Sequence, residues 1–172
     1  EQAWSIVYRT FAYTNHTVMK EALETWNSDL FRTLLPRIYT IVCEINQRFC
    51  TDLSVKHHLD LQTLSRMAIV AYHEVRMANL CVAGCHSVNG VSKLHSDIIR
   101  HQVFQDFYRV DPQKFQNVTN GIASRRWLYQ SNQGLTDLCR ELIGPDFLRD
   151  LSSLAQLKQY RQDPVVLQRM GE

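Results

Sequence analysis

The sequence predicts a mainly α protein with at most two short strands. Apolar residues recur every three or four positions through most of the 172 residues, which is the spacing of one face of a helix. Residues 67–72 are apolar and residues 114–122 alternate loosely, so these two stretches are the expected strands. The chain contains no internal repeat and no low-complexity segment. A helical array is therefore expected.

The first part of the chain is predicted to form helices separated by polar loops. Apolar spacing predicts helices at residues 1–11, 21–26, 28–49 and 61–66. Ser28 and Asp29 are suited to cap the third of these helices. Pro36 should kink or divide it, because proline has no backbone N–H to donate. Residues 11–17 and 51–60 are polar and are expected to be loops.

The second part of the chain is predicted to contain shorter helices. Residues 75–107 have helical apolar spacing, but Gly84 and Gly90 fall inside this block and should interrupt the helix, with a tight turn at Gly90. Ser124 is suited to cap a helix that carries Trp127. Three further helices are expected at residues 135–143, which Gly144-Pro145 should end, at 148–160, and from 163 onward.

Composition and charge argue against several classes of protein. Hydrophobic residues make up 45% of the chain and charged residues 21%, which is typical of a soluble globular domain and not of a disordered segment. The net charge of +2 comes from residues spread along the chain, so nucleic acid is not an expected partner. The chain has no apolar stretch of membrane-spanning length and no signal peptide, so we expect a cytoplasmic protein without a membrane partner.

The five cysteines predict neither disulfides nor a metal site. Their number is odd, and no two of them have CxxC spacing. The residues are Cys43, Cys50, Cys81, Cys85 and Cys139. Most of them are expected to be small core residues.

Three polar motifs interrupt the helical pattern. They read FAYTNHT at residues 11–17, HSVNGV at 86–91 and KFQNVTNGIASRRW at 114–127. His16 lies between an asparagine and a threonine, and such groups donate and accept hydrogen bonds as sugar hydroxyls require. A lone loop histidine is more often structural, however, and Asn120-Gly121 is first of all a turn signal that needs positive φ angles. The residues alone therefore leave a binding role and a structural role open.

Taken in this order and at this spacing, the three motifs resemble those of the α-glucan phosphorylases, the family of glycogen, starch and maltodextrin phosphorylases. The match runs from Glu1 to about Asp150 with few gaps. The resemblance implies that the chain is an internal part of a longer, two-lobed α/β enzyme with glycosyltransferase-B-type architecture. Residues 1–121 would close its N-terminal lobe, and residues 122–172 would open its C-terminal lobe.

The resemblance also implies an activity for that longer protein, here named the parent enzyme. It would cleave terminal glucose from an α-1,4-glucan with phosphate, release glucose 1-phosphate, and form a homodimer. Its cofactor would be pyridoxal 5'-phosphate, bound as a Schiff base to a lysine beyond Glu172. The residues that clamp the substrate phosphate would also lie beyond Glu172. No catalytic residue is therefore expected in this chain, and the chain alone is expected to be inactive.

The same resemblance implies roles for four residues. His16 would line the catalytic site, where its backbone helps to hold the reacting glucose. Asn120 would hydrogen-bond a glucose hydroxyl, and the backbone of Val91 would pass close to the same sugar. Trp127 would border the pyridoxal phosphate pocket. Without the resemblance, Val91 and Trp127 would be interpreted as core side chains.

Some positions depart from the family's pattern. Asn46 and Gln47 match a non-catalytic glucan-storage site of animal phosphorylases, but Cys43 replaces an aromatic residue that stacks on sugar there. Ala123-Ser124 stands where the family usually has Thr-Pro, and Lys20 where it usually has proline. No role is assigned to these positions. One alternative to an enzyme fragment is a function of another class, a non-catalytic helical module that binds glucans or a partner protein. A further alternative is a regulatory protein that derives from a phosphorylase and lacks catalysis.

Overall fold

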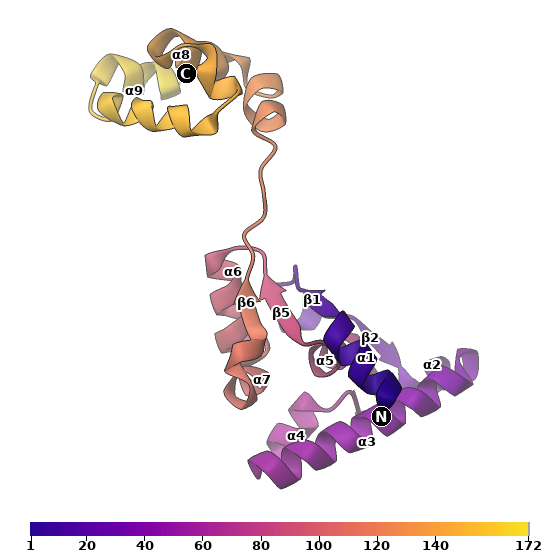
Figure 1. The fold of residues 1–172 in the computed structure, drawn as a ribbon. Helices are drawn as coiled ribbons and strands as arrows, with labels where there is room; N and C mark the ends of the chain where they lie inside the picture. Colours follow the sequence, from indigo (N-terminus) through magenta and orange to yellow (C-terminus); the bar gives the residue numbers. More distant parts are fainter. Residues whose placement is uncertain (172) are drawn as a thin grey trace. The chain divides into compact units, whose positions relative to one another are not determined.

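The structure is a computed structural model that describes residues 1–171. These residues form two compact units, one of residues 1–120 and a second that begins at Gly121. Both units are mostly helical (Figure 1). The predicted mainly α class is therefore confirmed.

Seven α-helices build the first unit, all within the described part of the chain. They are α1 (Gln2–Thr10), α2 (Ser28–Leu34), α3 (Pro36–His57), α4 (Leu61–Met67), α5 (Met77–Gly84), α6 (Lys93–Ile98) and α7 (Gln105–Val110). A π-helical turn, Ile99–Val103, continues α6, and short 3₁₀ turns form at Lys20–Ala22 and Pro112–Lys114. The interruptions predicted at the two glycines are confirmed, since α5 ends at Gly84 and a strand ends at Gly90.

Six short strands in residues 1–171 form two three-stranded sheets, more than the two strands that the sequence predicts. The parallel sheet has the order β1 (Ala12–Thr14), β5 (Ser87–Gly90), β6 (Phe115–Asn117). The antiparallel sheet has the order β2 (Thr25–Asn27), β4 (Glu74–Arg76), β3 (Val70–Ala71). Strands this short show almost no alternation of apolar and polar residues. Pairing between distant segments therefore decides where they form.

The helix predicted at residues 21–26 is wrong. The chain makes the 3₁₀ turn Lys20–Ala22 and then enters β2. In β2, Trp26 pairs with Val75 of β4, whose side chain is fully buried. Aromatic and β-branched residues favour a strand once a partner strand is present, and this pairing outweighs the weak local helical spacing.

The loop predicted at residues 51–60 is also mostly wrong, because α3 continues to His57. Leu53 is 3% exposed and joins the core, while the other residues of this turn, which are polar except for Val55, face solvent. His58 ends the helix in the left-handed conformation, with φ 51°. The division at Pro36 is confirmed, since α2 ends at Leu34 and α3 begins at the proline.

The cap predicted for α2 lies one residue earlier than expected. Asn27 rather than Ser28 or Asp29 precedes the helix, and its side-chain oxygen accepts hydrogen bonds from the backbone N–H groups of Asp29 (2.9 Å) and Leu30 (3.0 Å). These N–H groups have no partner within the helix, which is why an asparagine is favoured at this position.

Aromatic residues dominate the larger core cluster of the first unit. Phe104 is 2% exposed, and its ring centroid lies 6.4 Å from that of Tyr13, 6.0 Å from that of Phe107 and 6.4 Å from that of Phe115. Tyr13 belongs to β1 and Phe115 to β6. Phe104 therefore packs against both outer strands of the parallel sheet and holds them on the helices.

The second unit packs α8 (Gln133–Ile143) and α9 (Pro164–Gly171) with 3₁₀ segments at Pro145–Leu148 and Leu151–Tyr160. The predicted stop of α8 is confirmed, since Gly144 ends it with φ 77°. A π-helical segment, Arg125–Gln130, opens the unit, but the Ser124 side chain makes no capping hydrogen bond, so that predicted cap is wrong. Throughout residues 1–171, no helix has both the length and the apolar character that crossing a bilayer requires.

Candidate functional site

The three sequence motifs meet at one edge of the parallel sheet. β1, β5 and β6 run in the same direction, so their carboxyl ends lie together (Figure 1). In register, Thr14 is opposite Asn89, and Gly90 is opposite Asn117. The residues that follow these strands come from each of the three motifs. The carboxyl edge of a parallel sheet is where ligands bind in open α/β folds.

Backbone hydrogen bonds extend the pairing past the ends of the strands. The N–H of Asn15 donates to the carbonyl of Asn89 at 3.0 Å. The N–H of Val118 donates to the carbonyl of Gly90 at 3.1 Å, and that of Asn120 to the carbonyl of Val91 at 2.9 Å. Two residues with predicted sugar contacts, Val91 and Asn120, are thus held side by side.

The loop that carries His16 is shaped by its neighbour. Asn15 is 1% exposed, its side-chain amide donates to the Tyr13 hydroxyl at 2.9 Å, and its side-chain oxygen accepts from the N–H of Thr17 at 2.8 Å. A buried amide with both ends bonded fixes the backbone around it. His16 itself is exposed, and its imidazole makes no hydrogen bond within residues 1–171.

His95 joins the first two motifs, and the sequence interpretation missed it. Its side chain is 7% exposed, and Nδ1 accepts the N–H of Val91 at 3.2 Å. Because that N–H is a donor, the ring proton lies on Nε2, which donates to the carbonyl of Thr17 at 2.9 Å. The sequence did show a histidine soon after HSVNGV, at the start of an expected helix. It could not show the partner of this histidine, because Thr17 is 78 residues away.

Gly90 is required by a close approach and not by a turn. A Cβ at this position would lie 2.6 Å from the Ser96 hydroxyl and 2.8 Å from its backbone N. Gly90 is the last residue of β5 and is paired in register with Asn117, so the predicted tight turn is wrong. Ser96 in turn donates from Oγ to the side-chain oxygen of Asn117 at 2.8 Å. The absent side chain thus lets α6 pack directly on the ends of β5 and β6.

The Asn120-Gly121 turn predicted from the sequence is also wrong. Neither residue has a positive φ, which the expected turn types require. The segment instead lies along Gly90 and Val91, whose carbonyls accept the N–H groups of Val118 and Asn120. The side chain of Asn120 is exposed.

Trp127 lies in the second unit, whereas His16, Val91 and Asn120 lie in the first. Its indole is 62% exposed, and the guanidinium of Arg126 lies 5.8 Å from the centre of the ring. An arginine stacked near an aromatic face is a cation–π contact. The structure therefore brings three of the four predicted residues to one sheet edge, and the fourth belongs to the other unit.

The side chain of Asn46 holds a strand in place. Its oxygen accepts hydrogen bonds from the backbone N–H groups of Ile69 at 2.8 Å and Val70 at 3.2 Å. These bonds anchor β3 to α3. Asn46 is thus occupied by a structural role, while Gln47 is exposed.

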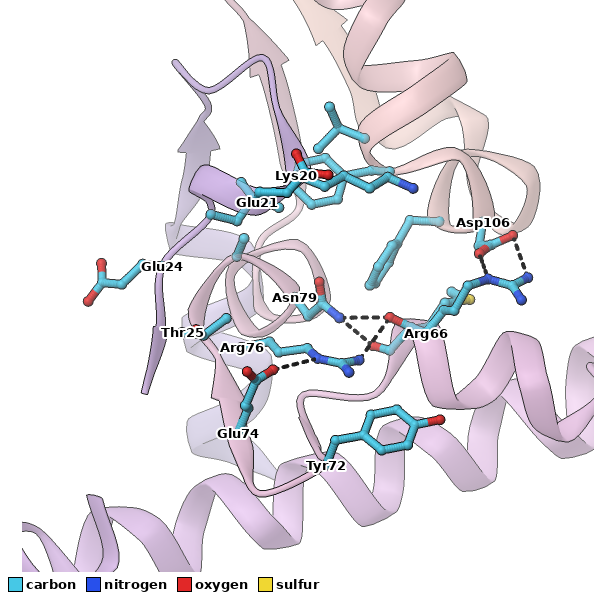
Figure 2. A pocket seen from close by; sticks show the side chains of 16 residues that line it. Lys20, Glu21, Glu24, Thr25, Arg66, Tyr72, Glu74, Arg76, Asn79 and Asp106 are labelled. Carbon is cyan, nitrogen blue, oxygen red and sulfur yellow. Dashed lines mark hydrogen bonds and ion pairs between the residues drawn. The ribbon is translucent and has the colours of Figure 1, made fainter. Parts of the chain in front are cut away.

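A cavity of about 430 Å³ lies elsewhere in the first unit, and none of the four predicted residues lines it. Figure 2 shows Asn79 and Arg76 pointing toward the backbone of Arg66. The Asn79 amide nitrogen lies 3.1, 3.2 and 3.0 Å from the carbonyl oxygens of Arg66, Met67 and Ala68. The last carbonyls of a helix have no partner within it, so these side chains complete the end of α4.

The polar groups at the sheet edge are mostly neutral. They are amides, hydroxyls, imidazoles and backbone groups, which suit a ligand with many hydroxyls. Burial raises the pKa of Tyr13, although its hydrogen bond with Asn15 acts in the opposite direction. Within residues 1–171, no three His, Cys, Asp or Glu side chains are grouped so that they would hold a metal ion.

Comparison with known proteins identifies the family. The sequence model of the carbohydrate phosphorylase family matches residues 1–172. Identity is 46% over 173 residues to the liver form of glycogen phosphorylase from Ovis aries, covering 99% of this chain and 20% of that protein. It is 48% over 166 residues to the human muscle form, covering 95% of this chain and 20% of the relative. It is 45% over 168 residues to glycogen phosphorylase from Bacillus subtilis (strain 168), covering 98% and 21%.

The chain thus spans about a fifth of the length of these curated relatives. The similarity extends across all three motifs, and the family resemblance inferred from them is confirmed. This chain belongs to the carbohydrate phosphorylase family.

Proposed function

We propose that this chain is part of an α-1,4-glucan phosphorylase, the parent enzyme, which transfers terminal glucose from glycogen or maltodextrin to phosphate. The observation that carries the proposal is the meeting of three motifs at the carboxyl edge of the parallel sheet. Asn120 and Val91 are joined there by a 2.9 Å backbone hydrogen bond. The relatives, which are named glycogen phosphorylases, support the same reaction.

In the proposed reaction, a phosphate oxygen bonds to the anomeric carbon while the glycosidic C–O bond breaks, and the leaving oxygen takes up a proton. The products are glucose 1-phosphate and a glucan shorter by one unit. A transition state with oxocarbenium character needs polar groups fixed around the sugar. His16, the backbone of Val91 and the amide of Asn120 would orient the glucose. The phosphate clamp and the proton donor would come from the rest of the parent enzyme.

Pyridoxal 5'-phosphate is the proposed cofactor of the parent enzyme. The exposed indole of Trp127, beside the cation of Arg126, fits a planar and anionic group. When bound, the cofactor would supply a phosphate group that takes part in proton transfer. Trp127 would border it, and the lysine that binds it is expected outside this chain.

The lobes of the parent enzyme are proposed to meet within this chain. Residues 1–121 would end the N-terminal lobe and residues 122–172 would begin the C-terminal lobe. The division of the chain into compact units after Asn120 supports this assignment. A homodimer in the cytoplasm is proposed from the family alone. Light scattering on the purified parent enzyme would measure its subunit number.

The test is an assay of glucose 1-phosphate released from maltoheptaose. The full-length parent enzyme and the 172-residue chain are compared, each with pyridoxal 5'-phosphate, with and without phosphate. We expect phosphate-dependent release by the parent enzyme and none by the chain alone. An inactive parent that still binds cofactor and glucan would contradict the proposal and favour a non-catalytic glucan-binding module.

A further inference from the structure

We propose that His95 is a positioning residue for the bound glucose, because its imidazole fixes the loop of His16 and the loop of Val91 at one separation. The inference rests on the proposed function, since it concerns the same sugar site. His95 does not itself contact the sugar in this proposal. It acts through the two backbone segments that do.

The hydrogen bonds of His95 begin where the sheet ends. The last backbone bond between the β1 and β5 segments joins the N–H of Asn15 to the carbonyl of Asn89. Beyond that point the imidazole bridges from Val91 to Thr17, with distances of 3.2 Å and 2.9 Å. His16 immediately precedes Thr17, so the bridge sets the distance between the backbones expected to hold the glucose.

Both ring nitrogens of His95 are occupied by backbone groups. Nδ1 accepts from Val91, and Nε2 donates to Thr17. The side chain is 7% exposed. A buried imidazole with both nitrogens bonded has no free atom with which to exchange a proton with substrate. A positioning role therefore fits it better than a catalytic one.

The helix that carries His95 is itself fixed on the sheet. Ser92 caps α6 by accepting the backbone N–H of His95 at 3.1 Å. Ser96, one residue after His95, donates to Asn117 at 2.8 Å and lies against Gly90. Asn117 belongs to the third motif. The imidazole is thus a rigid spacer between the first two motifs, and the helix that carries it is held in place on the third motif.

The test uses the full-length parent enzyme with three substitutions. His95→Phe keeps a ring but removes both hydrogen bonds. His95→Asn has an amide that reaches about as far as Nδ1 and keeps the Val91 bond, whereas His95→Gln reaches about as far as Nε2 and keeps the Thr17 bond. Initial rates are measured against glucose 1-phosphate at saturating maltoheptaose and against maltoheptaose at saturating glucose 1-phosphate, together with Tm.

We expect His95→Phe to lower kcat/KM for glucose 1-phosphate by between about tenfold and a hundredfold, since small misplacements of positioning groups have effects of that size. The KM for maltoheptaose should change much less. Each amide variant keeps one of the two bonds and should lose less than His95→Phe. Partial rescue of this kind is not expected if the residue only fills space. If His95→Phe does not fold, the kcat/KM values of the two amide variants for glucose 1-phosphate decide whether the inference holds.

Asp60→Ala is the matched control. It removes the cap of α4, where the Asp60 carboxylate accepts the backbone N–H of Thr63 at 2.9 Å, and it leaves α6 and both imidazole bonds in place. Its Tm should fall while its KM for glucose 1-phosphate stays at the unsubstituted value. If the His95 variants also lose only Tm and keep their KM and kcat/KM for glucose 1-phosphate, the inference about His95 is overturned while the proposed function stands. An unsubstituted parent enzyme without phosphorolysis would contradict the proposed function, and the inference with it, before any variant is compared.

Discussion

Gly90 and Ser96 approach so closely that any side chain on residue 90 would enter the space of Ser96. A Cβ would lie 2.6 Å from the Ser96 hydroxyl and 2.8 Å from its Cα. The contact seats the first turn of α6 on the ends of β5 and β6, next to the motif residues. Packing of this helix and geometry of the candidate sugar site are therefore linked.

Gly90→Ala is expected to destabilise the 172-residue chain by about 3 kcal/mol, because backbone atoms of Ser96 cannot rotate out of the way. Urea unfolding followed by circular dichroism measures the change. Gly84→Ala is the control, since its Cβ would meet only the Trp4 ring at 3.6 Å, an ordinary contact. We expect that variant to be neutral or slightly more stable. Equal stability of the two variants would contradict the close approach.

Asn79→Asp is expected to reduce the free energy of unfolding by more than about 2 kcal/mol at pH 7, because a carboxylate would face the three carbonyls to which the amide now donates. The same substitution at Asn132 is the control. The Asn132 oxygen accepts from the N–H of Leu135 at 3.0 Å, so a carboxylate caps that helix as well as an amide does. Similar losses at both sites would show that the amide of Asn79 is not needed as a donor.

Lys114 predicts a pH dependence of stability. Burial lowers the pKa of its ammonium group, although Asp111 acts in the opposite direction. Between the folded-state pKa and the ordinary value of 10.5, the unfolded chain binds more protons, so stability attributable to Lys114 rises with pH. The stability of Lys114→Met relative to the unsubstituted chain should therefore fall as pH rises from 8 to about 10.5.

Chemical denaturation at several pH values measures this difference. Lys114→Arg is a useful comparison, because arginine stays charged over this pH range. The stability attributable to residue 114 should therefore not rise with pH in that variant. The Lys114 ammonium also donates to the carbonyl of Val82 at 3.0 Å, and this bond is lost in the methionine variant at every pH. A stability difference that does not vary with pH would contradict the lowered pKa.

Asn120→Ala is expected to lower kcat/KM of the full-length parent enzyme for glucose 1-phosphate by roughly threefold to tenfold, as for loss of one hydrogen bond to a sugar hydroxyl. Stability should hardly change, because the side chain is exposed and the backbone bond to Val91 does not involve it. Gln116→Ala is the control, since Gln116 is an exposed amide in β6. Unchanged kinetics in both variants would remove Asn120 from the site.

Local chemistry was enough to predict the helices that have strong boundaries. Pro36 divides α2 from α3, and Gly144 ends α8. Each signal acts within a few residues, because proline lacks an N–H and glycine tolerates a positive φ. The three motifs were also identified from the sequence, since their order and spacing resemble those of one family.

The strands and the geometry of the sheet edge were decided by tertiary structure. Trp26 lies in a strand because Val75 pairs with it, and Asn120 lies beside Val91 because its N–H bonds to the Val91 carbonyl. The role of His95 depends on Thr17, 78 residues away. The sequence by itself determined the helical class, the breaks and the polar motifs. Only the folded chain brought those motifs together, because hydrogen bonds between distant segments form after the chain is compact and leave no local pattern to detect.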